Sequence, residues 1–320
     1  MLFSENRETF SRIAALYYLA EITQDEIAKI FGISRFKVSR VLKRCRAMKV
    51  VEFKINKSPE YLTNLEREIT DRLGISSATV VQSGSTLQES KANVAKMAAK
   101  HLERAICDGM KIGLSWGSTI QQMVRYYNKQ EYYPNTLFVQ LSGSLCSRPI
   151  LEDGYIDGNI FLQQFASKAH SGWSVFMVPY VVNNPALKEL LYEEPQIKKH
   201  VELFKKLDMA IVELGSDDPS KSVSYLSGYL TYEETKKLAD DGLGADVCGT
   251  RLTVNGEIRE TILKNRVLTI EPADLQMLEN VCAIGAGTEK VISFIAGCRS
   301  GIIKSAIMDE VCAISILSKH

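Results

Sequence analysis

The sequence predicts an α/β protein in two parts: a small all-helical, winged helix-turn-helix head and a large, doubly wound, Rossmann-like domain. Residues 23–46, TQDEIAKIFGISRFKVSRVLKRCR, place two helix-like patterns around a single Gly-Ile-Ser. From residue 78 onward, apolar β-rich runs alternate with amphipathic segments, as in parallel sheets covered by helices on both faces. Charge divides the chain in the same way, because residues 1–57 carry +6 and the remainder carries −5.

Composition limits the classes to which this chain can belong. With 320 residues and 45% apolar content, it can bury one large core and one small one. We expect residues 1–57 to form the head and residues 58–320 the large domain. Seven widely spaced cysteines without a Cys-x-x-Cys pair argue against a disulfide framework and a zinc site. No apolar run approaches the roughly 18 residues of a membrane helix, so we expect a cytoplasmic protein without a membrane partner, metal or cofactor.

Two helices are predicted in the first part of the head. Residues 8–20 form the first, and its apolar stripe consists of Ile13, Leu16, Tyr17 and Ala20. Thr23 is placed to cap the second, and Glu26 completes a capping box. The buried face of this second helix is expected to consist of Ile27, Ala28 and Ile30. Gly32 ends it, because glycine readily adopts the left-handed backbone of a tight turn between helices.

A third helix is predicted from its cap, Ser34, to about Cys45. Its inner face is apolar and consists of Val38, Val41, Leu42 and Cys45. Its outer face consists of Arg35, Phe36, Lys37, Ser39, Arg40 and Lys43. Between residues 34 and 51 there are seven cations and no acidic residue, which is unfavourable unless an anion lies against this face.

The layout is that of a helix-turn-helix, whose second helix enters the major groove of DNA by its N-terminal end. A solvated helix face is the alternative, but two capped helices around a glycine turn favour DNA. The predicted DNA contacts are Thr23, Gln24, Ser34, Arg35, Phe36, Lys37, Ser39, Arg40 and Lys43. Residues 50–57, VVEFKINK, alternate apolar and polar positions and predict a short wing or connecting strand.

The large domain begins with a predicted linker helix at residues 58–74, whose apolar positions also suit pairing with a second subunit. Strands are expected at ATVVQ from residue 78, KIGLSW from 111, TLFVQLS from 136, SVFMVPYVV from 174, DMAIVELGS from 208, NVCAIGAG from 280 and GIIKSAIM from 301. Helices are expected at 88–107, after Ser118, between 186 and 206, and at the end of the chain. Buried strands separated by helices predict a doubly wound sheet.

Three loops that follow predicted strands share one chemistry. They are SWGST at residues 115–119, SGS at 142–144 and GAGT at 285–288, with Lys290 beyond the last. Glycines let backbone N–H groups approach an anion, hydroxyls add donors, and a following helix N-terminus adds partial positive charge. Each loop alone is also what a tight turn uses, but the three together predict a phosphate-binding site. No complete Gly-x-Gly-x-x-Gly or Walker pattern is present, so a dinucleotide or nucleoside triphosphate is not favoured.

The stretch GADVCGTRLTVNGEI at residues 244–258 supplies another candidate. Asp246 lies just before an apolar Val-Cys pair, where a carboxylate needs hydrogen bonds from a polyol or from backbone. Asn255 and Gly256 predict a tight hairpin turn.

With these motifs, the chain resembles the SorC family of sugar-responsive bacterial transcription regulators, which includes the deoxyribonucleoside regulators. The likeness covers essentially the whole chain and rests on the helix-turn-helix stretch, IGLSWGSTI, VQLSGS, GADVCGTRLTVNGEI and AIGAGTEKVISFIAGCRSGIIKSAIMDEVCA. It implies a repressor or activator whose second domain looks like a phosphosugar isomerase or deaminase that has become a sensor.

Carried over by position, the resemblance implies a sugar-phosphate site at Ser115, Gly117, Ser118, Thr119, Ser142, Gly143, Asp246 and Lys290, with Gly285 and Gly287 in the third loop. The family often has Gly-Gly where this chain has Gly143 and Ser144, and again near residues 285–287, so two loops depart from its pattern. Some members place a basic residue at the position of Ser142.

Two other interpretations stay open. An isomerase or deaminase with an accessory DNA-binding domain needs a general base beside its substrate, but none of the four histidines follows a predicted strand. A DNA-binding protein without a ligand leaves the glycine loops unexplained. We expect a regulator of a carbohydrate operon, not an enzyme, with operator DNA and a phosphorylated sugar or polyol as partners. Symmetric half-sites need paired heads, so a dimer or tetramer of the chain is also expected.

Overall fold

The computed structural model describes residues 4–53, 58, 60–129, 131–145, 158–216, 218–259 and 261–319. The chain divides into two compact units: a head of residues 1–59 together with residues 84–86, and a body of residues 60–83 and 87–320. None of the helices in the described ranges has the length and hydropathy needed to cross a membrane. The same ranges contain no group of three or more His, Cys, Asp or Glu placed to hold a metal ion.

Three helices form the head, namely α1 (Arg7–Tyr18), α2 (Gln24–Phe31) and α3 (Arg35–Ala47). Both predicted caps are present. Thr23 and Glu26 form the capping box of α2, and the Ser34 hydroxyl accepts a hydrogen bond from the backbone N–H of Lys37. Gly32 ends α2 with a φ of 63°, the left-handed conformation predicted for this turn.

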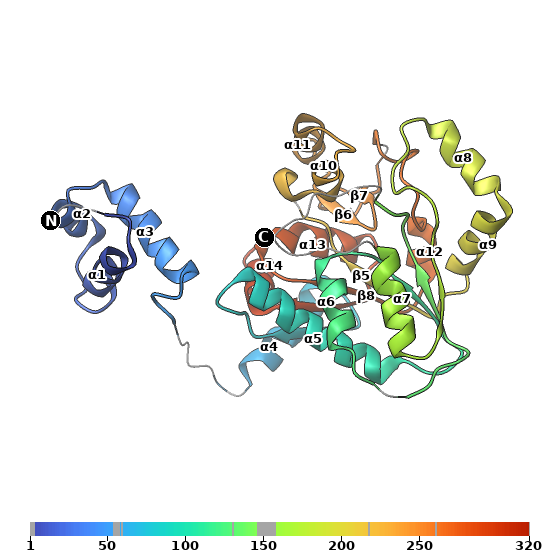
Figure 1. Ribbon diagram of the computed structural model, residues 1–320, viewed down its shortest axis with the longest axis horizontal. Coiled ribbons are helices and arrows are strands. Elements are labelled where there is room, and N and C mark those ends of the chain that lie inside the picture. The colour runs from blue at the N-terminus through green and yellow to red at the C-terminus, as the bar shows by residue number, and fades with distance from the viewer. Residues whose placement is uncertain are drawn as a thin grey trace. The chain divides into compact units, whose positions relative to one another are not determined.

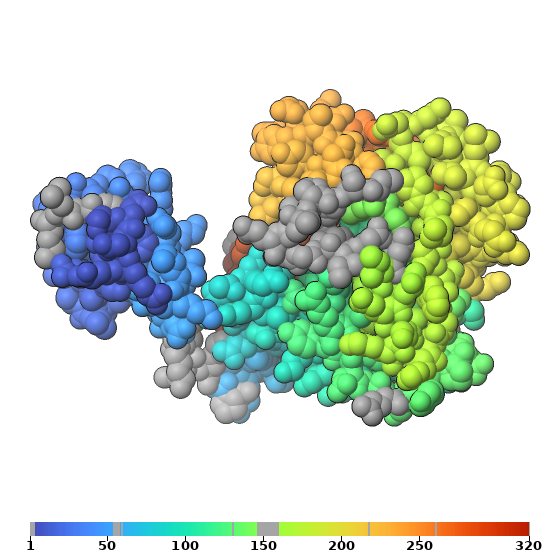
Figure 2. All heavy atoms as spheres, in the orientation of Figure 1, coloured from blue at the N-terminus to red at the C-terminus, as the bar shows by residue number. Residues whose placement is uncertain are grey.

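The head has an apolar core of its own, which is covered by the surface atoms of the head, drawn in blue in Figure 2. The core consists of Phe10, Ile13, Ala14, Ile27, Ala28, Phe31, Val38, Val41, Leu42 and Cys45. The predicted burial of Ile30 is wrong: its side chain is 46% exposed, and Phe31 is buried instead. Residues 50–53 form no strand, and the rest of the predicted wing, residues 54–57, lies outside the described residues.

A seven-stranded sheet is the centre of the body (Figure 1). Its strands are β1 (Ser77–Val81), β2 (Lys111–Leu114), β3 (Leu137–Gln140), β4 (Gly172–Ser174), β5 (Met209–Glu213), β8 (Val281–Gly285) and β9 (Ser305–Asp309). They lie in the order β1-β9-β8-β5-β2-β3-β4, and every neighbouring pair is parallel. The predicted doubly wound α/β fold is confirmed.

Helices cover both faces of this sheet. One face carries α5 (Leu87–Ala105), α6 (Ser118–Tyr126) and α7 (Gly158–Lys168), which Figure 1 shows side by side. The other face carries α4 (Tyr61–Leu73), which is the predicted linker helix, α9 (Pro195–Phe204), α12 (Pro272–Met277), α13 (Val291–Arg299) and α14 (Glu310–Leu317). The remaining elements are α8 (Pro185–Glu193), α10 (Val223–Leu226), α11 (Tyr232–Asp240) and two short 3-10 helices, η1 (Pro219–Lys221) and η2 (Thr288–Lys290).

Consecutive residues of a strand pack in the apolar cores on opposite faces of the sheet. In β5, Ile211 packs in the core under α5, α6 and α7, whereas Ala210 and Val212 pack in the core on the opposite face. Strands that are buried on both faces are apolar at every position, so they appear in the sequence as short continuous runs. This is why most of the predicted strands are found in place.

The path of the chain through the sheet reverses between β2 and β5. From β2 the chain continues to β3 and β4 at one edge, whereas from β5 it continues to β8 and β9 toward the other. The two connections leave in opposite directions, so a crevice opens beyond the carboxyl ends of these neighbouring strands. Ligands of doubly wound proteins bind at such a crevice.

Two regions of the body differ from the prediction. The run SVFMVPYVV is not a regular strand, because β4 ends at Ser174 and the following residues make isolated bridges at Pro179 and Val181. A separate antiparallel pair, β6 (Ala245–Val247) and β7 (Thr250–Leu252), occupies part of GADVCGTRLTVNGEI. Its turn residues, Cys248 and Gly249, have φ values of 50° and 79°, as in the type I′ turns of tight hairpins.

The predicted turn at Asn255 and Gly256 is also present. The N–H of Gly256 donates to the carbonyl oxygen of Thr253 at 2.8 Å, and Gly256 has a φ of 85°. An isolated bridge between Leu252 and Ile258 extends β7 past this turn.

A buried histidine lies beside β3. His200 on α9 is 4% exposed, and its Nε2 lies 2.8 Å from the carbonyl oxygen of Gln140. A carbonyl only accepts hydrogen bonds, so Nε2 carries the proton and Nδ1 accepts from the Ser174 hydroxyl at 2.7 Å. Burial lowers the pKa of His200 from its ordinary value of 6.5.

We expect the free energy of unfolding to fall as the pH drops below the ordinary histidine pKa of about 6.5. The unfolded chain binds a proton at His200 in that range and the folded chain does not, so acid favours the unfolded state. Urea denaturation between about pH 8 and about pH 5 should show a weaker pH dependence in His200→Gln than in the parent. His170→Gln, at an exposed histidine, is the control. Equal pH dependence in the parent and His200→Gln would contradict this assignment.

Candidate functional site

A cavity of about 230 Å³ lies beyond the carboxyl ends of β2 and β5, where the strand order reverses. Six of the predicted ligand residues line it: Ser115, Gly117, Ser118, Ser142, Asp246 and Lys290. They come from four separate stretches of the sequence. The structure therefore brings the first two predicted loops, the lysine after the third loop and the predicted carboxylate together in one place.

The other four predicted ligand residues do not line the cavity. Thr119 is fully buried, and the carbonyl oxygen of Gly143 accepts a hydrogen bond from Trp116 Nε1 at 3.1 Å. Gly285 lies under Lys290, because a Cβ at Gly285 would stand 3.2 Å from Lys290 Cγ. The N–H of Gly287 donates to Asp309 Oδ1 at 2.8 Å.

The carboxylate of Glu213, the last residue of β5, binds the N-terminus of α6. Its Oε2 accepts from the backbone N–H of Thr119 at 2.7 Å and of Ile120 at 3.1 Å, and its Oε1 accepts from the Thr119 hydroxyl at 2.9 Å. The backbone N–H of Glu213 donates to Ser115 Oγ at 2.8 Å, which ties the ends of β2 and β5 together. The donors predicted to bind a phosphate are thus engaged by a side chain of the protein itself.

Two buried hydroxyl groups, those of Ser142 and Thr269, form a hydrogen-bonded pair at the cavity. Ser142 is 2% exposed, and its Oγ lies 2.7 Å from Thr269 Oγ1. The Thr269 hydroxyl donates to the carbonyl oxygen of Cys248 at 2.8 Å, so Ser142 is the donor toward Thr269. Ser142 therefore joins the loop after β3 to the turn between β6 and β7.

Asp246 lines the cavity and lies next to a buried arginine, Arg251. Its Oδ1 accepts from the N–H of Gly249 at 2.8 Å, and its Oδ2 lies 3.4 Å from Arg251 Nη2. The side chain of Arg251 is 3% exposed and that of Asp246 is 13% exposed. Burial and the nearby Asp246 raise the pKa of Tyr180 well above its ordinary value, so the Tyr180 hydroxyl stays protonated. The predicted need of Asp246 for hydrogen bonds is met in part by backbone.

Lys290 extends into the cavity from η2. It is 8% exposed, and its ammonium donates to the carbonyl oxygen of Leu214 at 2.7 Å. Burial lowers its pKa, while the negative charges of Glu213, Glu289 and Asp246 oppose that change. A buried ammonium flanked by carboxylates is placed to donate hydrogen bonds to oxygen atoms of a ligand.

Several residues of the cavity were missed by sequence reasoning. Glu213 had a signal, because it is a charged residue at the end of the apolar run MAIV. Lys91 lies on α5, with its Nζ 3.4 Å from Ser118 Oγ, and Lys221 forms a 2.7 Å ion pair with Glu289. Nothing in the sequence around Lys91 and Lys221 distinguishes them from lysines on an ordinary solvated surface. Among the described residues, no histidine lines the cavity, so the general base of an enzyme is not supplied by a histidine there.

In the head, α3 carries the predicted DNA-binding surface. Arg35, Phe36, Ser39, Arg40 and Lys43 are exposed, and the Phe36 side chain is 86% exposed. Thr23 caps α2 and Ser34 caps α3, and Gln24 is the first residue of α2.

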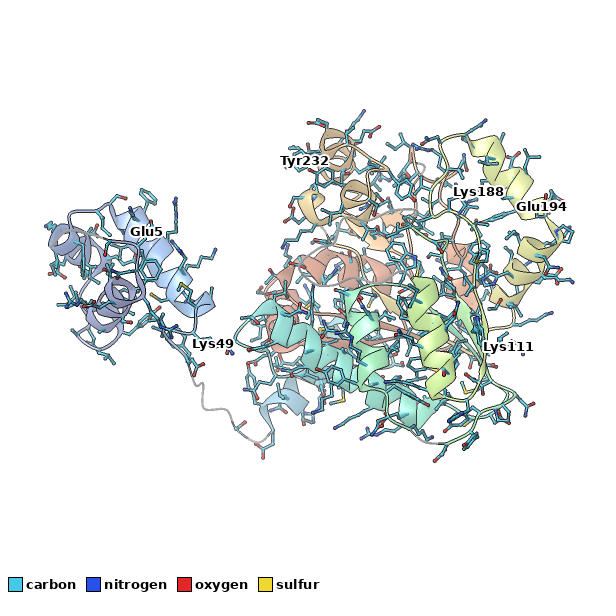
Figure 3. The ribbon with its side chains drawn as sticks, viewed as in Figure 1. Glu5, Lys49, Lys111, Lys188, Glu194 and Tyr232 are labelled. Carbon is cyan, nitrogen blue, oxygen red and sulfur yellow. The ribbon has the colours of Figure 1, made fainter. Side chains whose placement is uncertain are left out.

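The acidic groups that meet this surface come from other elements. Glu5 lies beside α3 (Figure 3), 3.7 Å from Lys37 and 2.9 Å from Arg44. Asp25 lies 3.8 Å from Arg35, whereas Arg40 and Lys43 form no ion pair within the described part of the chain. Hydrogen bonding to Arg44 lowers the pKa of Glu5, so Glu5 stays ionised. The start of α3 thus presents exposed cations next to a tight turn, as a recognition helix does.

Known proteins share this arrangement. A family model described as "Putative sugar-binding domain" matches residues 57–318. The sorbitol operon regulator of Klebsiella pneumoniae is 25% identical over 309 residues, which cover 96% of both chains. The deoxyribonucleoside regulator of Bacillus subtilis is 24% identical over 307 residues, again with 96% coverage of both.

The crystal structure of the full-length sorbitol operon regulator SorC matches the fold with a TM-score of 0.74, at 24% identity, over 99% of this chain and 100% of that one. Both relatives are named as regulators, in agreement with the predicted function class. Because the family model spans most of the chain and the match to these regulators continues through the head, the protein belongs to the sugar-binding family and, within it, to the SorC family of transcription regulators.

Proposed function

We propose that this protein is a DNA-binding transcription regulator of a carbohydrate operon, and that a sugar or polyol bound in the cavity controls its affinity for operator DNA. The observation that carries the proposal is the combination of an exposed basic α3 with a cavity at the strand reversal, in one chain. α3 supplies the DNA contacts, and the cavity supplies carboxylate acceptors and ammonium donors for hydroxyl groups.

The sequence predicts a phosphate on the ligand, and the charges that line the cavity bear on this prediction. Three lysines and three acidic residues line it: Lys91, Lys221, Lys290, Glu213, Asp246 and Glu289. This balance suits many hydroxyl groups, and it does not provide the clear excess of cations that a dianionic phosphate would favour.

The active form is proposed to be a dimer or tetramer, because one head reads too few base pairs and symmetric half-sites require paired heads. Light scattering on the operator complex tests this point, and a monomer on DNA would contradict it. The chromosome is the binding partner, so the proposal places the protein in the cytoplasm.

We expect Lys290→Met to weaken carbohydrate binding by about 1.5–3 kcal/mol, because it removes a charged hydrogen-bond donor from the cavity. Calorimetric titration of the parent and the variant with a panel of sugars and polyols, free and phosphorylated, measures the loss. Lys198→Met is the matched control, because Lys198 is an exposed lysine on α9.

The same titrations should be repeated with operator DNA present. Coupling between two sites is reciprocal, so DNA should change carbohydrate affinity by the factor by which the carbohydrate changes DNA affinity. No coupling in either direction would exclude control of DNA binding by the cavity. Turnover of a bound compound would instead support the enzyme interpretation.

A further inference from the structure

The N-terminus of α6 already holds an anion. The Glu213 carboxylate accepts two backbone N–H bonds and one hydroxyl bond there, from Thr119 and Ile120. Exposed backbone N–H groups and the partial positive charge of a helix N-terminus form the site that phosphate groups use in many proteins. In this protein, the same donors are satisfied by a side chain from the neighbouring strand.

The sequence of the loop is adapted to this carboxylate. A Cβ at Gly117 would lie 2.1 Å from Glu213 Oε2 and 2.5 Å from Glu213 Cδ. Gly117 is therefore required by the close approach of Glu213, and not by positive φ, because its φ of 162° is extended backbone. The glycine that the sequence predicts for the approach of a phosphate makes room for an internal carboxylate.

A phosphate at this place would meet two penalties. Its donors are occupied, so each new hydrogen bond would replace one that Glu213 makes. Its charge would also stand next to the Glu213 carboxylate, and like charges a few ångströms apart repel strongly in a partly buried site. The positive end of α6 is thus neutralised before any ligand enters.

We propose that Glu213 is a built-in replacement for the phosphate of a ligand, and that the cavity selects an uncharged sugar or polyol over its phosphate ester. This inference rests on the proposed function and narrows it. The other lining groups suit hydroxyls: Asp246 accepts, and Lys290 and Ser118 donate. Trp116 and Tyr180, in edge-to-face contact at 5.0 Å, offer an apolar surface to the C–H groups of a carbohydrate.

The test is calorimetric titration of the full-length protein with sorbitol, erythritol and xylitol, the terminal phosphate ester of each, and inorganic phosphate. The parent should bind a free polyol at least about 100-fold more tightly than its ester, because the ester brings two negative charges to Glu213. Glu213→Gly should reverse or remove this preference and gain binding of inorganic phosphate, because the donors of Thr119 and Ile120 become available.

Two further variants make the test specific. Glu213→Gln keeps the volume of the side chain and its hydrogen-bond acceptor but removes the charge. It should therefore reduce the preference for the free polyol over its ester, and it provides this test even if Glu213→Gly folds poorly. Glu202→Gln removes an exposed carboxylate on α9 that does not line the cavity, so it should keep the preference for the free polyol.

Each outcome has a distinct meaning. Tighter binding of the ester than of the free polyol by the parent would overturn the role of Glu213 and leave the proposed function intact. Inorganic phosphate binding that is equal in the parent and in Glu213→Gly would overturn it as well. Failure of every free and esterified carbohydrate to bind the parent would overturn the proposed function itself.

Discussion

The double variant Arg35→Ala/Arg40→Ala is expected to bind operator DNA about 2–6 kcal/mol more weakly than the parent, because each lost bidentate base contact costs about 1–3 kcal/mol. Arg35 is the first residue of α3, and Arg40 lies about 1.4 turns further along the helix; both are exposed. A guanidinium at either position can donate two parallel hydrogen bonds to the edge of guanine. Both side chains are exposed, so their removal should leave the stability of the head nearly unchanged.

Fluorescence anisotropy with a duplex selected by the parent from a random library measures the loss. The salt concentration must be matched, because phosphate contacts make the affinity depend steeply on it. Arg12→Ala is the control: Arg12 is an exposed arginine on α1 that pairs with Glu8. Binding of the double variant at the level of the parent would remove α3 from the interface.

The second large effect concerns the ion pair in the wall of the cavity. Asp246→Ala should lower the free energy of unfolding by about 3–5 kcal/mol, because it leaves the charge of Arg251 buried without its carboxylate. The N–H of Gly249 would also lose its acceptor. Urea denaturation of the ligand-free protein measures this change, and loss of carbohydrate binding should accompany it.

Removing one partner of a surface ion pair changes stability much less than removing one partner of a buried pair, so a surface pair is the control. Asp240→Ala breaks a pair with Lys236 whose side chains are 61% and 53% exposed, so it should change stability by less than about 1 kcal/mol. The double variant Asp246→Ala/Arg251→Met should recover part of the loss, because no unpaired charge remains buried. If Asp246→Ala and Asp240→Ala were equally stable, the buried pair would have no structural role.

The fold could be predicted because its signals are local. The apolar runs of β5 and β8 are buried on both faces, and the capping box of α2 is formed by residues three positions apart. The prediction of the buried face of α2 is wrong at Ile30 and Phe31 for a related reason. These two adjacent apolar residues lie near the edge of the buried stripe, and packing against α1 and α3 decides which of them is buried.

The site could be predicted only in outline. The loop that contains Gly117 and Ser118 is visible in the sequence. The group that accepts hydrogen bonds from the N–H donors after this loop, the Glu213 carboxylate, comes from another strand. A glycine that admits a phosphate and a glycine that admits a carboxylate look the same in a sequence. The turn at Cys248 was missed because one of its two left-handed residues is not a glycine.

The strand order also has a consequence for the newly made chain. β1, the first strand of the body, has β9 as its neighbour in the sheet, and β9 is the last of the seven strands of this sheet along the sequence. The head contains contacts between helices that are close in sequence, so its core can form while the ribosome is still translating the body. β1 must wait until Ser305–Asp309 has emerged before it gains a partner. A nascent chain that stops before β9 would therefore carry a complete head, an unpaired β1 and a sheet that ends at β8. β8 is buried at every position in the finished protein, and an apolar strand exposed at a sheet edge invites aggregation.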